Sequence, residues 1–264
     1  MRKKLSHKLA RWGLLLVTVI IAVFALQITV LAFPQMFVSK NIQRGSIKIF
    51  YDGDQDAYVA EIAEDVDSRL RATVFYDSTQ NTNVYFLRNQ GLYKMFVRLS
   101  MLPAAPQGFA LSIFDNAFVD EARVKELAEM TGGLPKYSIY EGNPAHTIVH
   151  EVGHLIITGQ IGRGTWKQLP HWKQEGFPEY IANISLIRGD STASLPDRVA
   201  ILNDDSIWGW KRGWDRIHYE AGLLVEFLLD VKGYTVEDIV ADSVTSETTL
   251  TELLEWCRLR EIPQ

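Results

Sequence analysis

The longest uncharged stretch of the sequence lies near its start. Residues 13–33 run for 21 residues without a charged side chain and with one glutamine. A helix of this length can cross the hydrocarbon core of a bilayer, where a single chain segment satisfies its backbone hydrogen bonds only as a helix. Five basic residues and no acidic residue precede it in residues 1–12. Because basic flanks stay in the cytoplasm, we expect residues 1–12 to be cytoplasmic and residues 13–33 to be a transmembrane signal anchor.

A cleaved signal peptide is the alternative interpretation of this stretch. Such peptides carry an apolar part of about 7–15 residues, followed by a cleavage site with small residues. Residues 13–33 are longer, and no small-x-small site follows them. We therefore favour an uncleaved single-pass anchor, with the rest of the chain outside the cytoplasm.

The part of the chain after the apolar stretch is acidic. Five of the 27 basic residues precede that stretch, so 22 remain against 32 acidic residues, and the net charge of this part is near −10. This balance argues against nucleic acid, or an anionic membrane surface, as a partner. The single cysteine, Cys257, allows no intramolecular disulfide. Stability outside the cytoplasm must then come from the core and a bound metal.

The length of 264 residues fits one domain with an appendage. We expect residues 34–45 to be a linker and residues 46–264 to form one domain. Alternating and helical apolar patterns predict strands at 46–51, 83–87, 108–114 and 137–140, and helices at 57–73, 118–130, 215–233, 235–242 and 249–259. Asp56 is positioned to cap the first of these helices, and Thr131-Gly132-Gly133 to end the second. The expected fold is α+β, with a small sheet packed on helices.

One short motif carries the chemistry, and it is His150-Glu151-Val152-Gly153-His154. Residues four apart on a helix lie on the same face, so both imidazoles can reach one metal ion. Glu151 lies beside them and is placed to deprotonate a metal-bound water. The alternative is a pair of core histidines that bind their neighbours.

The residues around this motif predict a buried helix over 144–159. Asn143 is a good N-cap, Pro144 a good first helical residue, and Gly159 can close the C-terminal end. His146, one turn before His150, is expected to be a residue of the helix start.

A catalytic zinc site needs a third protein ligand and leaves one position for water. A metzincin would have a histidine six residues after His154, where this sequence has Gln160, so that class is excluded. Glu175, 21 residues after His154, lies in the run Trp-Lys-Gln-Glu-Gly-Phe-Pro-Glu-Tyr. The histidine pair followed by this run resembles the gluzincin zinc metallopeptidases, most closely the peptidase MA-like and membrane alanyl aminopeptidase branch. The resemblance covers residues near 144–233.

The resemblance implies a zincin-like catalytic domain that holds Zn²⁺ through His150, His154 and Glu175. It also implies that Glu179 is a carboxylate that orients a ligand histidine. Pro178 departs from the family, which has alanine there. It costs nothing if the helix begins near Glu175, whereas a kink is expected if the helix begins at residue 170. His171 is a competing ligand, but a fourth protein ligand would close the site to water.

Two further residues follow from the same resemblance. Tyr219 matches the family tyrosine that donates a hydrogen bond to the tetrahedral oxyanion, with His218 as a substitute. The alternative for Tyr219 is a core tyrosine. Asn116-Ala-Phe118 is similar to the edge-strand tripeptide of thermolysin-like endopeptidases, so Asn116 is a candidate substrate-binding residue. The Gly-x-Met-Glu-Asn strand of the aminopeptidases is absent, so we favour an endopeptidase.

The sequence therefore predicts a membrane-anchored zinc metallopeptidase that acts on a peptide or protein. The alternative from another class is a membrane-tethered binding or assembly module with a structural zinc ion. A third possibility is a gluzincin-like fold that binds no metal.

Overall fold

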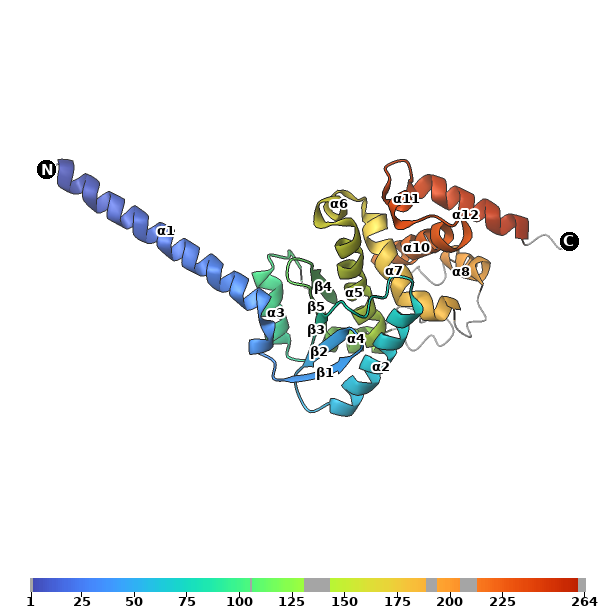
Figure 1. The fold of residues 1–264 in the computed structure, drawn as a ribbon, viewed down its shortest axis with the longest axis horizontal. Coiled ribbons are helices and arrows are strands. Elements are labelled where there is room, and N and C mark those ends of the chain that lie inside the picture. Colours follow the sequence, from blue (N-terminus) through green and yellow to red (C-terminus); the bar gives the residue numbers. More distant parts are fainter. Residues whose placement is uncertain (1, 105, 131–142, 189–193, 205–212, 261–264) are drawn as a thin grey trace.

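The computed structural model describes residues 2–104, 106–130, 143–188, 194–204 and 213–260. It is a mixed α+β structure, with one five-stranded sheet and a long helix that projects from the domain (Figure 1). The elements of the first half are α1 (Arg2–Ala32), η1 (Pro34–Met36), β1 (Lys40–Arg44), β2 (Ile47–Tyr51), α2 (Asp56–Ala72), β3 (Thr82–Leu87), α3 (Gln90–Leu99), β4 (Gly108–Leu111), β5 (Asn116–Asp120) and α4 (Glu121–Met130). The α+β class predicted from the sequence is confirmed.

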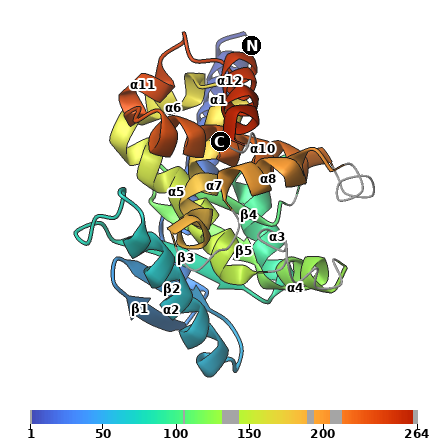
Figure 2. The same cartoon turned by 90° about the vertical axis from the view of Figure 1, so that its right-hand side faces the viewer.

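The second half of the described chain is helical. Its elements are α5 (Pro144–Ile161), α6 (Arg163–Gln168), α7 (His171–Arg188), α8 (Leu195–Leu202), α10 (Gly213–Glu226), the π-helical turn η2 (Phe227–Val231), α11 (Val236–Val240) and α12 (Ser246–Arg260). Figure 2 shows α11 and α12 at the end of the molecule opposite β1 and α2, with α8 and α10 between the two ends. The three C-terminal helices expected at 215–233, 235–242 and 249–259 are present.

Helix α1 contains the expected apolar segment. Its stretch Arg11–Ala32 is long and apolar enough to cross a membrane, and only 6% of its most apolar window is buried. An apolar helix so exposed to water is not a core helix. The cytoplasmic placement of its N-terminus stays a prediction.

The sheet has the strand order β1-β2-β3-β5-β4. Strands β2, β3 and β5 run parallel, and β1 and β4 pair antiparallel at the two edges. One face packs on α2, α4 and α5, and the other face packs on α3 and the end of α1. A third apolar core joins α8, α10 and α12.

Several strand boundaries differ from the expectation. Residues 40–44 were expected in a linker, but they form β1, whose polar sequence suits an exposed edge strand. Residues 118–120 were expected in a helix, but they belong to β5, and the helix begins at Glu121. All five residues of β5 are buried because helices cover both faces, so its sequence does not alternate. The strand expected at 108–114 ends at Leu111, because the chain turns through Asp115, whose φ is +51°.

One smaller expectation also differs from the structure. Asp56 does not cap α2: it is the first helical residue, and its carboxylate accepts hydrogen bonds from Lys40 and Tyr51. The strand expected at 137–140 and the helix end at 131–133 lie outside the described residues.

Helices α5 and α7 cross at a glycine. A β-carbon on Gly153 would lie 2.8 Å from the α-carbon of Pro178, closer than real β-carbons approach other atoms. Helix α7 begins at His171, so Pro178 lies inside it. The helix therefore starts well before Glu175, close to the second start considered above, residue 170. The same helix pair carries the predicted metal ligands, so Gly153 sets how close those ligands come.

We expect Gly153→Ala to lower the free energy of unfolding by about 1–3 kcal/mol, because the clash is with backbone, which cannot rotate away. The matched control is Gly159→Ala in the same helix, where a β-carbon has no neighbour within 4 Å. That control should be more stable than the natural chain by about 0.5–1 kcal/mol, because alanine favours helix. Thermal unfolding of the detergent-solubilised full chain measures both. Equal effects of the two substitutions would contradict the close crossing.

Candidate metal centre

The helix that carries the histidine motif begins as the sequence predicts. The Asn143 side chain accepts hydrogen bonds from the backbone N–H groups of Ala145 and His146, and Pro144 is the first helical residue. The other end differs, because Gly159 does not close the helix. It continues to Ile161, and Gly162, with φ +81°, follows as the C-cap. Helix α5 is apolar along most of its length and packs between the sheet and α7.

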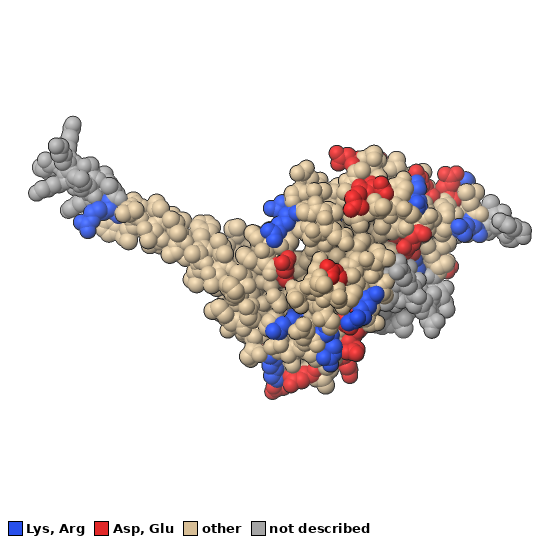
Figure 3. All heavy atoms as spheres, in the orientation of Figure 1, with Lys and Arg blue, Asp and Glu red and all other residues tan. Residues whose placement is uncertain are grey.

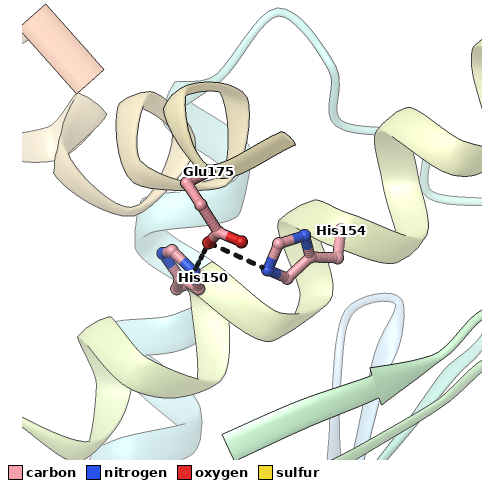
Figure 4. Close-up of side chains that lie close together, drawn as sticks. All are labelled: His150, His154 and Glu175. Atoms are coloured by element: carbon pink, nitrogen blue, oxygen red, sulfur yellow. Dashed lines mark hydrogen bonds and ion pairs between the residues drawn. The ribbon is translucent and has the colours of Figure 1, made fainter. Parts of the chain in front are cut away.

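The three predicted metal ligands lie together (Figure 4). Glu175 Oε2 is 3.3 Å from His150 Nε2 and 3.6 Å from His154 Nε2. Zinc binds such atoms at about 2.0–2.2 Å, so two ligands of a tetrahedral ion lie about 3.3–3.6 Å apart. The three ligand atoms lie within 4.8 Å of one another, so these side chains form a group that could hold a metal ion.

Glu179, one turn after Glu175 on α7, contacts a histidine of this group. Its Oε2 is 2.9 Å from His150 Nδ1, and its other oxygen accepts a hydrogen bond of 3.0 Å from the Asn183 amide. If the proton of His150 is on Nδ1, the Nε2 lone pair faces Glu175 and the space for a metal. His146 also contacts Glu179, with its Nε2 3.3 Å from Glu179 Oε1. His146 is thus a buried partner of Glu179 in addition to starting the helix.

Two more histidines surround Glu175. His218 Nε2 of α10 is 3.4 Å from Glu175 Oε2, and His171 Nε2 is 3.7 Å from Glu175 Oε1. His171, Glu175 and His218 also satisfy the distances of a possible metal group among the described residues. His218 was only a substitute for Tyr219 in the sequence analysis. Gly222 lies four residues later on the same face of α10 and packs on Glu179. This face of α10, which includes His218, is therefore turned toward the candidate ligands.

The structure places the Tyr219 side chain in a packed core. Its hydroxyl donates a hydrogen bond of 2.8 Å to the Arg198 carbonyl, and its ring is buried in the core of α8, α10 and α12. Adjacent residues on a helix point about 100° apart. His218 contacts Glu175, whereas the hydroxyl group of Tyr219 is directed to the Arg198 carbonyl.

The structure places Asn116 in the interior of the sheet. Asn116 lies in β5, an inner strand of the sheet, and its side chain is fully buried. The side-chain amide donates to the Leu31 carbonyl at 2.9 Å, and its oxygen lies 3.3 Å from the Asn83 amide. The edge strand next to β5 is β4.

Glu151 is buried at the inner end of the site. Burial raises its pKa to about 8, against the lowering effect of the nearby His150 charge. It lies against Gly108, the first residue of β4, where a β-carbon would be 2.6 Å from Glu151 Oε1. A carboxyl group with a pKa near neutrality can both accept and release a proton, as a general base must.

The ligand groups have opposite protonation preferences in the metal-free protein. Burial opposes the charge on His150, but its bonds to Glu175 and Glu179 raise its pKa well above 6.5. Burial favours a neutral Glu175, but its contacts with His150, His154 and His218 lower its pKa to about 2. Burial lowers the pKa of His154 to about 3. At neutral pH these pKa shifts favour an ionised Glu175, a neutral His154 and a protonated His150.

Comparison with known proteins does not identify the chain. No family model matches it, and no curated protein matches its sequence. The function is therefore inferred from the geometry of the site.

We expect Zn²⁺ binding at pH 7 to release at least one proton, because His150 ligates only in its neutral form. The dissociation constant should rise about tenfold per proton as pH falls by one unit, since each proton competes with the metal. Isothermal titration calorimetry of the metal-free full chain, in Tris and in phosphate, gives the proton count from the difference in heat. The same heat in both buffers would contradict a protonated His150.

Proposed function

We propose that this chain is a membrane-anchored zinc-dependent peptidase of gluzincin type. The observation that carries the proposal is the convergence of three side chains: Glu175 Oε2 lies 3.3 Å from His150 Nε2 and 3.6 Å from His154 Nε2, and all three ligand atoms lie within 4.8 Å of one another. These are two imidazoles and one carboxylate, the ligand set of catalytic zinc sites such as that of thermolysin. The buried Glu151 beside them supports hydrolysis, because a purely structural site has no use for a base.

Each residue of the site has one role in this proposal. His150, His154 and Glu175 would hold the zinc ion, and Glu179 fixes the ring of His150 by its 2.9 Å contact with Nδ1. A bound zinc ion would polarise the substrate carbonyl and lower the pKa of its water to about 7. Glu151 takes the proton of the attacking water and delivers it to the leaving amine. His218 replaces Tyr219 as the donor to the carbonyl oxygen of the substrate.

The edge of the sheet supports a peptide as the substrate. Strand β4 is at the edge, and its first residue, Gly108, lies against Glu151. An extended peptide can pair with a free strand edge through its own backbone, which places the peptide bond beside the catalytic groups. Such pairing does not need a free peptide terminus, so we favour an endopeptidase over an aminopeptidase.

We expect Glu151→Gln to keep one zinc ion per chain and to lower kcat by about 10²–10⁴-fold, because only the base is lost. The full chain in detergent is assayed with a peptide library read by mass spectrometry, and zinc is measured in parallel. The control is Glu61→Gln on the exposed side of α2, which should change neither quantity. Full activity of the Glu151 variant, or a natural chain without zinc, would refute the proposal.

A second candidate function has one observation in its favour. His218 lies as close to Glu175 as the ligand histidines do, with Nε2 3.4 Å from Oε2. If His218 is a fourth zinc ligand, the site has no open position, and the chain is a membrane-tethered binding or assembly module with a structural zinc ion.

The substitution His218→Ala separates these two functions. For the peptidase, we expect an unchanged zinc content and a kcat about 10²–10³-fold lower, as for loss of a donor to the developing oxyanion. For the structural module, we expect loss of zinc and a lower melting temperature. Tyr219→Phe is the matched control, and it should leave zinc content and turnover near those of the natural chain.

A further inference from the structure

Apolar side chains are exposed where α1 joins the domain. Phe33, Met36 and Phe37 follow α1 directly, and 45–69% of their surface is exposed. Met101 lies in the turn after α3 and is 77% exposed. We call these four residues the apolar collar. In Figure 3 the uncharged surface of α1 continues onto the domain at this junction.

The turn after α3 is held beside α1, at the level of its last turns. The Gln27 side chain donates a hydrogen bond of 2.6 Å to the Leu99 carbonyl, two residues before Met101. Gln27 precedes the end of α1, at Ala32, by five residues, which corresponds to about 7 Å along a helix. The turn therefore reaches back along the apolar segment that can span a membrane.

The junction between α1 and the domain is built from direct contacts. The Leu31 carbonyl accepts from Asn116, and the Tyr85 hydroxyl donates to the Gln35 side chain. The Phe37 ring packs on the Phe96 ring of α3 at 6.0 Å. These bonds tie α1 to the centre of the sheet, so the collar keeps its position relative to the membrane helix.

The charges of this region differ from those of the rest of the domain. Residues 90–114 contain Lys94 and Arg98 but no acidic residue, in a chain with 32 acidic residues. Both cations are exposed on α3. Although the exported part is acidic as a whole, this stretch has apolar residues flanked by cations, which suits the interface between headgroups and acyl chains.

We propose that the turn after α3, led by Met101, enters the lipid bilayer beside α1 and seats the domain on the membrane. The occupant of the collar is lipid. The collar lies on the side of the sheet that packs on α3, whereas the metal centre lies on the side that packs on α5. The membrane and the metal centre are therefore on opposite sides of the sheet. This inference depends on α1 as a membrane helix and does not depend on peptidase activity.

The test places a fluorophore on the collar of the full chain in vesicles of phosphatidylcholine with a minority of phosphatidylglycerol. In a Cys257→Ala background, Met101→Cys or, as a second position, Met36→Cys is labelled with the environment-sensitive dye NBD. The control is Val74→Cys, which is 68% exposed and follows α2 on the other side of the sheet. Lipids with a nitroxide on the acyl chain report contact with the bilayer.

We expect blue-shifted emission at positions 101 and 36 and quenching several-fold stronger than at position 74. Equal quenching at all three positions would overturn the proposal. A blue shift without quenching would also overturn the proposal if the shift disappears in vesicles that contain one chain each. In that case a second copy of the chain, and not lipid, would cover the collar. Release of the chain from the vesicles by alkaline carbonate would overturn it as well.

Discussion

The site depends on how closely three helices approach one another. Helices α5 and α7 meet at Gly153, and α7 and α10 meet at Gly176 and Gly222. At Gly176 a β-carbon would lie 2.6 Å from the Ala221 carbonyl oxygen, and at Gly222 one would lie 2.8 Å from Glu179 Cγ. Each added methyl group would push a helix outward. The histidines and carboxylates converge because these backbones can touch.

The same close packing brings together acidic groups whose charge a bound cation would balance. Glu151, Glu175 and Glu179 lie in one largely buried region; among the described residues, four histidines contact Glu175 and two contact Glu179. Buried charges cost several kcal/mol each unless they are paired. In the metal-free protein, a protonated His150 balances part of this charge, and burial keeps Glu151 largely neutral near pH 7. A divalent cation would replace the proton of His150 and would favour the ionised form of Glu151.

Features that depend on local sequence could be predicted better than features that depend on contacts between distant segments. The α+β class, the start of α5 and the apolar helix follow from composition, capping and helical spacing, so they could be predicted. The edge strand β1 could not, since its polar sequence becomes a strand only by pairing with β2. Within the site, the spacing of His150 and His154 is a property of one helix. The choice between His218 and Tyr219 depends on how α10 is rotated about its axis against α7. No short sequence pattern predicts this rotation. The position of Asn116 in an inner strand was not predicted for a similar reason, because the strand order decides which strand is the edge.

The way α1 ends has a consequence for the geometry of any reaction at the membrane. Hydrogen bonds hold the end of α1 against the domain: Gln27 donates to the Leu99 carbonyl, and the Leu31 carbonyl accepts from Asn116. Just after α1, Gln35 accepts from the Tyr85 hydroxyl. If α1 crosses a membrane, the height of the metal centre above the bilayer is then fixed by the fold. The proposed peptidase would in that case select segments of its substrates by their distance from the membrane as well as by their sequence.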